Sequence, residues 1–173
     1  MKKDKIDAGF EQLESIATGF RTSQVLFTAV RLRLFDALKD GQKTARQLAK
    51  ILGTDLRGTT ILCNALAGLN LIKKRGNSYG LSLLAKKYLL TDSPYSQHAI
   101  WLHNAALYEK WGKLFDVVKT GKPIQWDEVS TDLQADEQSF ARAMASTASF
   151  LARETAEAID LSNTKTMLDI GGG

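Results

Sequence analysis

The pattern of apolar and polar positions predicts a mainly helical chain whose first helical region changes character along its length. In residues 8–20, apolar side chains recur at helical spacing and form one stripe on an otherwise polar helix. In residues 24–38, apolar side chains cover nearly the whole circumference. A helix that is apolar all round must be covered all round, and a second subunit is the favoured cover in so small a domain. We therefore expect a homodimer built on residues 8–38; the alternative is a buried central helix of a monomer.

The next part of the chain has the order helix, turn, helix, hairpin, short helix, which is the order of a winged helix. Residues 45–52 and 55–69 carry the two helical patterns, and residues 71–81 read as two short strands about a Gly76-Asn77 turn. Capping and stop residues mark the helix boundaries: Thr44, Gly53, Thr54 or Asp55, and Ser82.

Two longer helical segments follow. Ser93-Pro94 combines a capping serine with a proline at the first helical position, which predicts a helix from there to Lys119. Residues 124–135 read as an irregular connection, and residues 136–161 as one long helix. The apolar residues expected on the inner side of that long helix are Phe140, Met144, Ala148, Leu151 and Ile159.

The chain ends in Thr166-Met-Leu-Asp-Ile-Gly-Gly-Gly173, which reads as a strand running into a glycine-rich turn. Such a turn begins many nucleotide-type cofactor sites, because it bends tightly and lets backbone N–H groups approach the ligand where a Cβ would obstruct them. Three glycines alone do not establish the G-x-G-x-x-G spacing of a nicotinamide-binding domain, so this reading stays a competitor.

Composition excludes several classes. With 173 residues and 44% hydrophobic content the chain is globular, and it has no apolar window long enough for a bilayer span and no secretory leader, so we expect a cytoplasmic protein without membrane attachment. The single cysteine, Cys63, lies in an apolar run, which predicts a buried structural thiol rather than a nucleophile. His98 and His103 are five residues apart and do not share a helix face, so no metal site is predicted.

Charge raises a nucleic-acid hypothesis. The net charge is +4, and residues 44–82 hold six Lys or Arg against one acid. If the second helix of the winged helix lay in a DNA groove, its outward residues would be Arg57, Thr60, Asn64 and Ala67, of which one is basic. Nucleic-acid binding is therefore disfavoured, and a winged-helix transcriptional regulator is kept as the alternative function.

Taken together, the segments resemble the S-adenosylmethionine (SAM)-dependent O-methyltransferases of the plant type and the acetylserotonin type, bacterial members included. The resemblance covers essentially the whole chain, and the order and spacing of its segments are more specific than any one of them. The segments that carry it are Gln24–Leu38, Thr44–Ala49, Leu62–Leu69, Trp111–Pro123, Phe140–Met144 and Met167–Gly173.

The resemblance implies three parts. Residues 1–92 would form a winged-helix dimerisation domain, and residues 93–161 connecting helices that line the acceptor pocket. Residues 162–173 would form the first strand and glycine turn of a truncated class I (Rossmann-like α/β) SAM-binding domain. The whole fold class is thus mainly α, followed by the start of an α/β domain.

The resemblance also implies site residues. Asp169, Gly171, Gly172 and Gly173 match cofactor-binding positions, and Met144, Phe140 and Phe150 match positions that line the pocket of a small-molecule acceptor. The family's reaction is displacement of the sulfonium methyl by an acceptor hydroxyl, commonly phenolic, with a histidine general base. That histidine lies downstream of the glycine motif, so no catalytic residue is expected in this chain. We expect the 173 residues alone to be inactive, and the sequence does not identify the acceptor.

Overall fold

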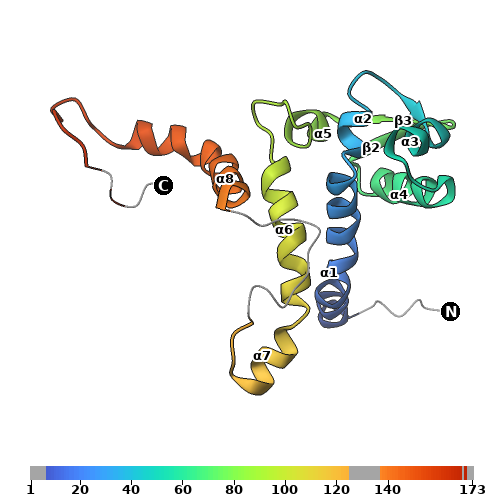
Figure 1. Cartoon of the computed structure of the whole chain (residues 1–173), viewed down its shortest axis with the longest axis horizontal. Helices are drawn as coiled ribbons and strands as arrows, with labels where there is room; N and C mark the ends of the chain where they lie inside the picture. Colours follow the sequence, from blue (N-terminus) through green and yellow to red (C-terminus); the bar gives the residue numbers. More distant parts are fainter. Residues whose placement is uncertain (1–6, 125–136, 169, 171–173) are drawn as a thin grey trace. The chain divides into compact units, whose positions relative to one another are not determined.

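The structure, a computed structural model, describes residues 7–124, 137–168 and 170, except the side chains of residues 137–139, 150 and 153. It divides into two compact units, Met1–Ser82 and Leu83–Gly173, each described here by itself. Helices dominate both units (Figure 1). The described residues contain one sheet, which is small and antiparallel. The predicted mainly α class is confirmed, whereas the functional boundaries predicted after residues 92 and 161 stay predictions.

The first unit begins with a single long helix, α1 (Ala8–Arg31). It passes through the polar residues between the two apolar patterns, because the hydroxyls of Thr22 and Ser23 donate to the Gly19 carbonyl at 2.8 and 3.3 Å and leave the helix intact. The chain breaks later, at Arg33, whose backbone is left-handed with φ 54°, and the short helix α2 (Leu34–Ala37) follows. The prediction of one helix over 24–38 is therefore wrong.

The winged helix is confirmed. Helices α3 (Ala45–Leu52) and α4 (Leu56–Gly68) precede a hairpin of β2 (Ile72–Arg75) and β3 (Ser78–Leu81). The sequence pattern did not predict β1 (Lys43–Thr44), a strand of two residues. It pairs with the edge of β3 that β2 leaves open, so that β3 is the central strand in the order β1-β3-β2.

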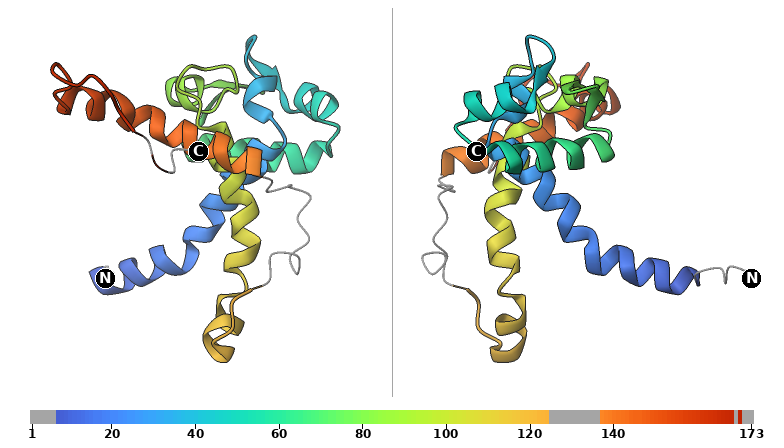
Figure 2. Two further views of the ribbon diagram at one scale, coloured as in Figure 1. Left: turned by 60° about the vertical axis from the view of Figure 1, so that its left-hand side comes forward. Right: turned by 90° about the vertical axis from the view of Figure 1, so that its right-hand side faces the viewer.

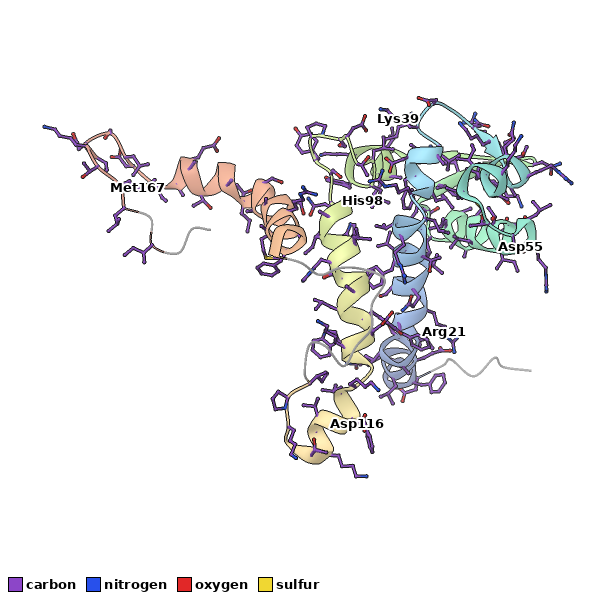
Figure 3. The ribbon with its side chains drawn as sticks, viewed as in Figure 1. Arg21, Lys39, Asp55, His98, Asp116 and Met167 are labelled. Carbon is purple, nitrogen blue, oxygen red and sulfur yellow. The ribbon has the colours of Figure 1, made fainter. Side chains whose placement is uncertain are left out.

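Local capping explains the boundaries of these helices. The Thr44 side chain accepts from the Gln47 N–H, and the Gln47 side chain accepts from the Thr44 N–H at 2.8 Å, which completes a capping box. Gly53 ends α3 with φ 65°, a conformation that glycine adopts without a Cβ penalty. Asp55 begins α4 by accepting from the Gly58 N–H at 2.7 Å (Asp55 is labelled in Figure 3).

The core of the first unit lies where α1 ends and α2, α3, α4 and β2 meet. Its largest side chains are buried to 1% exposure or less. They are Val30, Leu34, Phe35, Leu38, Leu48, Cys63, Leu66 and Ile72. The N-terminal half of α1 contributes none of them and projects beyond the other elements of its unit (Figure 2).

The second unit contains four described helices. They are α5 (Leu83–Tyr88), α6 (His98–Trp111), α7 (Leu114–Thr120) and α8 (Glu137–Ala158). Helices α6 and α8 pack against each other, while α7 lies at the C-terminal end of α6, away from α8 (Figures 1 and 2).

The predicted helix start at Ser93-Pro94 is wrong by four residues. The Ser93 hydroxyl donates to the Lys87 carbonyl and accepts from the Tyr95 N–H at 3.2 Å, and the Gln97 N–H donates to the Tyr88 carbonyl at 2.7 Å. These bonds tie the turn back to α5, so α6 begins only at His98. The predicted single helix to Lys119 is also interrupted, because α6 ends at Trp111 and α7 starts after Gly112 and Lys113.

The predicted inner face of the last helix is wrong as well. In α8 the buried residue is Ala143, and Phe140, Met144, Leu151 and Ile159 are all exposed. The contacts of α8 with α6 and its N-cap run through the Ser146 carbonyl, which accepts from Gln97, and through the edge of the Phe140 ring, which is still half exposed.

We predict that replacing Leu66 with alanine destabilises the first unit by about 2–5 kcal/mol, because the side chain is fully buried and the change leaves a cavity. Ile61→Ala on the same helix is the matched control; its side chain is 58% exposed, and its loss costs less than about 1 kcal/mol. Urea unfolding followed by far-ultraviolet circular dichroism measures both. Equal losses for the two variants would contradict the assignment of the core.

Candidate functional site

The most prominent surface of the first unit is the α1 stripe, which we define as Phe10, Leu13, Ile16 and Phe20. Their spacing places them on one side of the helix, and they are 57%, 67%, 71% and 50% exposed. Few contiguous apolar surfaces of this kind are left in water by a soluble protein unless they bind something.

The apolar run over residues 24–38 is covered differently from the expectation. Ala29, Val30, Leu34, Phe35 and Leu38 are buried within the unit itself. The chain's own α2, α3 and α4 cover this part. This agrees with the alternative prediction, a helix buried within a single subunit. The exposed apolar surface lies instead on the stripe further towards the N-terminus.

Two of the polar groups predicted on the outward face of α4 already have hydrogen-bond partners. The Asn64 side-chain oxygen accepts from Lys74 Nζ at 2.8 Å and from the Tyr79 hydroxyl at 2.9 Å, and both partners belong to the hairpin. The Thr60 hydroxyl donates to the Leu56 carbonyl of its own helix at 2.7 Å. Of the predicted outward polar side chains, Asn64 therefore helps to pack the hairpin on α4, and Thr60 bonds within its own helix.

One of the predicted acceptor-binding residues, Phe140, contacts α6, and Met144 follows it one turn later on α8. The Phe140 ring meets the His103 ring edge-on, with 5.5 Å between the centroids, and Met144 is 39% exposed. Nδ1 of His103 is buried, and no other described residue offers it a hydrogen-bond partner. Gln97 joins the same two helices by donating from Nε2 to the Ser146 carbonyl at 2.7 Å, a contact that no local sequence pattern signals.

The third predicted acceptor residue, Phe150, and the predicted cofactor residues Asp169, Gly171, Gly172 and Gly173 lie outside the described side chains and residues. The predicted strand is absent from residues 164–168, and Met167 (Figure 3), Leu168 and Ile170 are 81%, 82% and 86% exposed. A strand takes its hydrogen bonds from a neighbouring strand, and the described residues supply none here.

A second apolar surface is the α7 face, which consists of Trp111 at the end of α6 and of Leu114, Phe115 and Val118 on α7. These residues are 67%, 48%, 73% and 75% exposed. The signal was present in their i, i+3, i+4, i+7 spacing, which is that of an amphipathic helix. Periodicity identifies such a face but does not say whether the chain covers it.

Cys63 is confirmed as a buried thiol. It is fully inaccessible, and burial raises the pKa of the thiol to about 11. A nucleophilic cysteine needs the opposite shift, because the thiolate is the reactive form. Within the described residues, no three His, Cys, Asp or Glu side chains lie close enough to hold a metal ion.

Comparison with known proteins decides the family. Residues 14–91 match the family model of the O-methyltransferase dimerisation domain. The chain is 35% identical over 181 aligned residues to acetylserotonin O-methyltransferase of Mus musculus, an alignment that covers 95% of this chain and 47% of the mouse protein. The chain belongs to this O-methyltransferase family. The resemblance inferred from the sequence segments is confirmed.

Solved structures of family members agree in fold. Human N-acetylserotonin methyltransferase in complex with SAM matches with a TM-score of 0.77 and 29% identity, over 94% of this chain and 52% of the human chain. LaPhzM, at 24% identity, shares the fold with a TM-score of 0.83 over 97% of this chain and 53% of its own. The chain thus spans about half the length of the curated relatives and solved structures it matches.

The matched residues 14–91 include part of one of the two exposed apolar surfaces, the α1 stripe. The dimerisation domain of this O-methyltransferase chain includes the winged helix, α5 and the part of the α1 stripe formed by Ile16 and Phe20. The α7 face lies outside the matched residues. None of the helices in the described part of the chain has the length and hydropathy that crossing a bilayer requires.

We predict that Cys63 resists a soluble thiol reagent at about pH 8, close to the ordinary thiol pKa, and reacts fully once urea unfolds the chain. The raised pKa keeps the thiol protonated in the folded state, and burial excludes the reagent. The measurement is the absorbance of the released chromophore, with free cysteine as the control. Rapid labelling of the folded chain would contradict the structural role.

Proposed function

We propose that this chain is the N-terminal, subunit-pairing part of a SAM-dependent O-methyltransferase that methylates a hydroxyl of a small aromatic acceptor. Two copies pair through residues 8–38, with the α1 stripe as the main contact. The observation that carries the proposal is that an exposed apolar stripe lies on a helix largely within the residues matched by a dimerisation-domain model.

The energetics of the stripe support pairing. Burying one fully exposed Leu, Ile or Phe side chain contributes about 1.5–3 kcal/mol, and the four stripe residues are half to two-thirds exposed. In a two-fold symmetric dimer every contact occurs twice, so the stripe contributes eight such side chains. Among the described residues, the N-terminal half of α1 also has no buried side chain, and packing of an apolar face stabilises most protein helices.

The proposed acceptor wall rests on the α6–α8 pair. Phe140 and Met144 offer apolar, half-exposed side chains on which a flat ring can lie, and Nδ1 of His103 is a polar atom beside them. The named mouse relative acts on acetylserotonin, an aromatic hydroxyl compound. The chemical role of this wall is to position the acceptor, because the proposed general base lies beyond these residues.

The proposed cofactor contacts rest on the sequence Met167–Gly173. Glycines leave room for a ligand to approach the backbone N–H groups, and Asp169 supplies a carboxylate that accepts hydrogen bonds. The solved human relative holds SAM. Bound SAM supplies an electrophilic methyl group on a sulfonium centre.

The alternative of a DNA-binding regulator has one observation in its favour, the exposed Lys73, Lys74 and Arg75 of β2. These cations fit phosphate contacts, but base readout also needs free polar groups on α4. The Asn64 oxygen, one of those groups, already accepts two hydrogen bonds from the hairpin. The packing role of the winged helix therefore accounts for more of the contacts.

We predict that the 173-residue chain is a dimer of two 19.0 kDa subunits in size-exclusion chromatography with light scattering at micromolar concentration. Leu13→Glu combined with Ile16→Glu makes it monomeric, because two charges would be buried in the apolar contact. Ser15→Glu, on the opposite side of α1, leaves the dimer intact. All three positions are exposed in the single chain, so the circular dichroism spectrum stays unchanged. A monomeric wild type would refute the pairing.

We predict that SAM gives no thermal shift with the 173-residue chain, but raises the unfolding temperature of a chain continued past Gly173 by the methyltransferase domain of the parent gene. A ligand that binds only the folded state stabilises it by about 2.7 kcal/mol at a hundred times its Kd. The glycine turn alone lacks the helix whose N-terminus completes such a site. Tight binding by the 173-residue chain, or none by the longer one, would contradict the cofactor assignment.

A further inference from the structure

Gln97, the residue before α6, is bonded to α8 close to the proposed acceptor wall. We propose that Gln97 is a positioning residue for that wall: its side chain fixes where α8 lies along α6, and so where Phe140 and Met144 meet the acceptor. This inference rests on the proposed function, which places the acceptor on these two side chains. It goes further by naming the residue that sets their position.

The backbone of Gln97 is held on both sides. Its N–H donates to the Tyr88 carbonyl of α5 at 2.7 Å, and its carbonyl accepts from the Trp101 N–H of α6 at 3.2 Å. The hydroxyl of the preceding Ser96 accepts from the N–H of His98, which Figure 3 labels, at 3.3 Å. The Gln97 side chain therefore starts from a turn that hydrogen bonds fix in place.

Both hydrogens of the Gln97 side-chain amide are used. Nε2 donates to the Ser146 carbonyl at 2.7 Å and to the Ser96 carbonyl at 3.1 Å. An amide NH₂ has two donors, and a carbonyl only accepts, so the amide nitrogen must face these two groups. Gln97 is the N-cap of α6, yet its side chain makes no capping bond to that helix and reaches α8 instead.

Two contacts between the helices share one register. Gln97 meets Ser146; six residues later, His103 meets Phe140, which lies six residues before Ser146. Equal spacing in opposite directions is what two antiparallel helices give, and six residues span about 9 Å of helix. Figure 1 shows the first part of α8 beside α6 and its later part leading away. These two points together fix the direction of α8 and its position along α6.

The Gln97 bond is the more restrictive of the two contacts. Aromatic rings attract one another over centroid distances of about 4.5–7 Å, so the pair of His103 and Phe140 tolerates some sliding. A hydrogen bond weakens steeply when its donor and acceptor lose their alignment. Met144 lies two residues before Ser146, so any shift of α8 at Ser146 carries Met144 with it.

The first test uses the 173-residue chain and needs neither cofactor nor acceptor. The chain has two histidines, so its proton NMR spectrum contains two imidazole Cε1–H signals, which His98→Gln assigns. Phe140→Leu shows how much of the His103 shift comes from the aromatic ring. Gln97→Glu keeps the size and shape of the side chain but has no N–H. It is expected to move the His103 signal most of the way to its position in Phe140→Leu.

Three further variants separate positioning from loss of the fold, which circular dichroism monitors. Gln97→Met removes the donor without adding a charge and is expected to move the His103 signal as Gln97→Glu does. Gln97→Lys restores N–H donors and is expected to return the signal towards its wild-type position. Ser149→Ala removes the other side-chain donor to the Ser146 carbonyl, a bond of 2.8 Å within α8, and is expected to leave the signal in place. An unmoved signal in both Gln97→Glu and Gln97→Met would overturn the inference.

The second test uses the enzyme extended past Gly173, with a hydroxylated aromatic acceptor that its wild type methylates, chosen from a panel that includes acetylserotonin. A misplacement of about 1 Å can lower a rate by about a hundredfold. Gln97→Glu is therefore expected to lower kcat/KM for the acceptor by roughly ten- to a hundredfold, while KM for SAM stays unchanged. An unchanged kcat/KM, or an equal effect on both substrates, contradicts a role in positioning the acceptor.

The two tests separate this inference from the proposed function. If the His103 signal does not move but the extended wild type transfers methyl groups, the inference fails and the proposed function stands. If the signal moves but the extended wild type methylates no hydroxyl of the panel, the proposed function fails, and the acceptor role of Gln97 fails with it.

Discussion

Apolar side chains on a helix have to leave water, and α1 meets this requirement within its own unit over only part of its length. Its C-terminal end packs Ala29 and Val30 into the core with Leu34 and Phe35. Its N-terminal half carries an equally apolar stripe that the described residues of the unit leave exposed. Local effects such as the Asp7 cap contribute about 1 kcal/mol, which is less than the cost of leaving four large side chains in water. In the proposed dimer, the same burial of the α1 stripe therefore stabilises this half of α1 and drives association of the subunits.

The winged helix supplies the rigid base from which α1 projects. Tyr79 is almost fully buried, yet its hydroxyl reaches Asn64, and Lys74 reaches the same oxygen from the neighbouring strand. These bonds hold the hairpin against α4 and occupy the polar group that a DNA-reading helix would present. The remaining cations of β2 also have a structural reason, because β2 is an edge strand and charged side chains protect such an edge from pairing with other chains. A basic winged helix in this chain therefore does not require a nucleic-acid partner.

Sequence reasoning succeeded where short-range chemistry decides the structure. The capping box at Thr44, the left-handed Gly53 and the hairpin about Gly76-Asn77 each depend on residues within a few positions of one another. It failed where a distant contact competes with a local signal. Ser93-Pro94 has the chemistry of a helix start, but the bond from Gln97 to Tyr88 fixes a turn there instead. The break at Arg33 has no glycine to announce it, since a non-glycine residue takes the left-handed conformation.

The second kind of error concerned which side of α8 is buried, and this error also affects the candidate site. Periodicity shows that Phe140, Met144, Leu151 and Ile159 share a side of α8, but it cannot show that the buried residue of α8 is Ala143 instead. Of the candidate site, Phe140 was predicted only as an inner-side residue of its helix, and its contact with His103 required the fold.

The exposed apolar residues of the second unit extend the argument made for α1. Phe140 and Met144 on α8, and Met167 and Leu168 after it, are apolar side chains whose surfaces the described residues leave open. A strand at Met167 needs neighbours on which to form its hydrogen bonds, and an acceptor wall at Met144 needs an opposite wall to exclude water. In the proposed enzyme the same partner structure answers both needs, because a SAM-binding domain that pairs with the segment before the glycines also brings the cofactor towards α8. The open faces of α8 and of Met167 and Leu168 then share one proposed partner, and neither is expected to be covered without it.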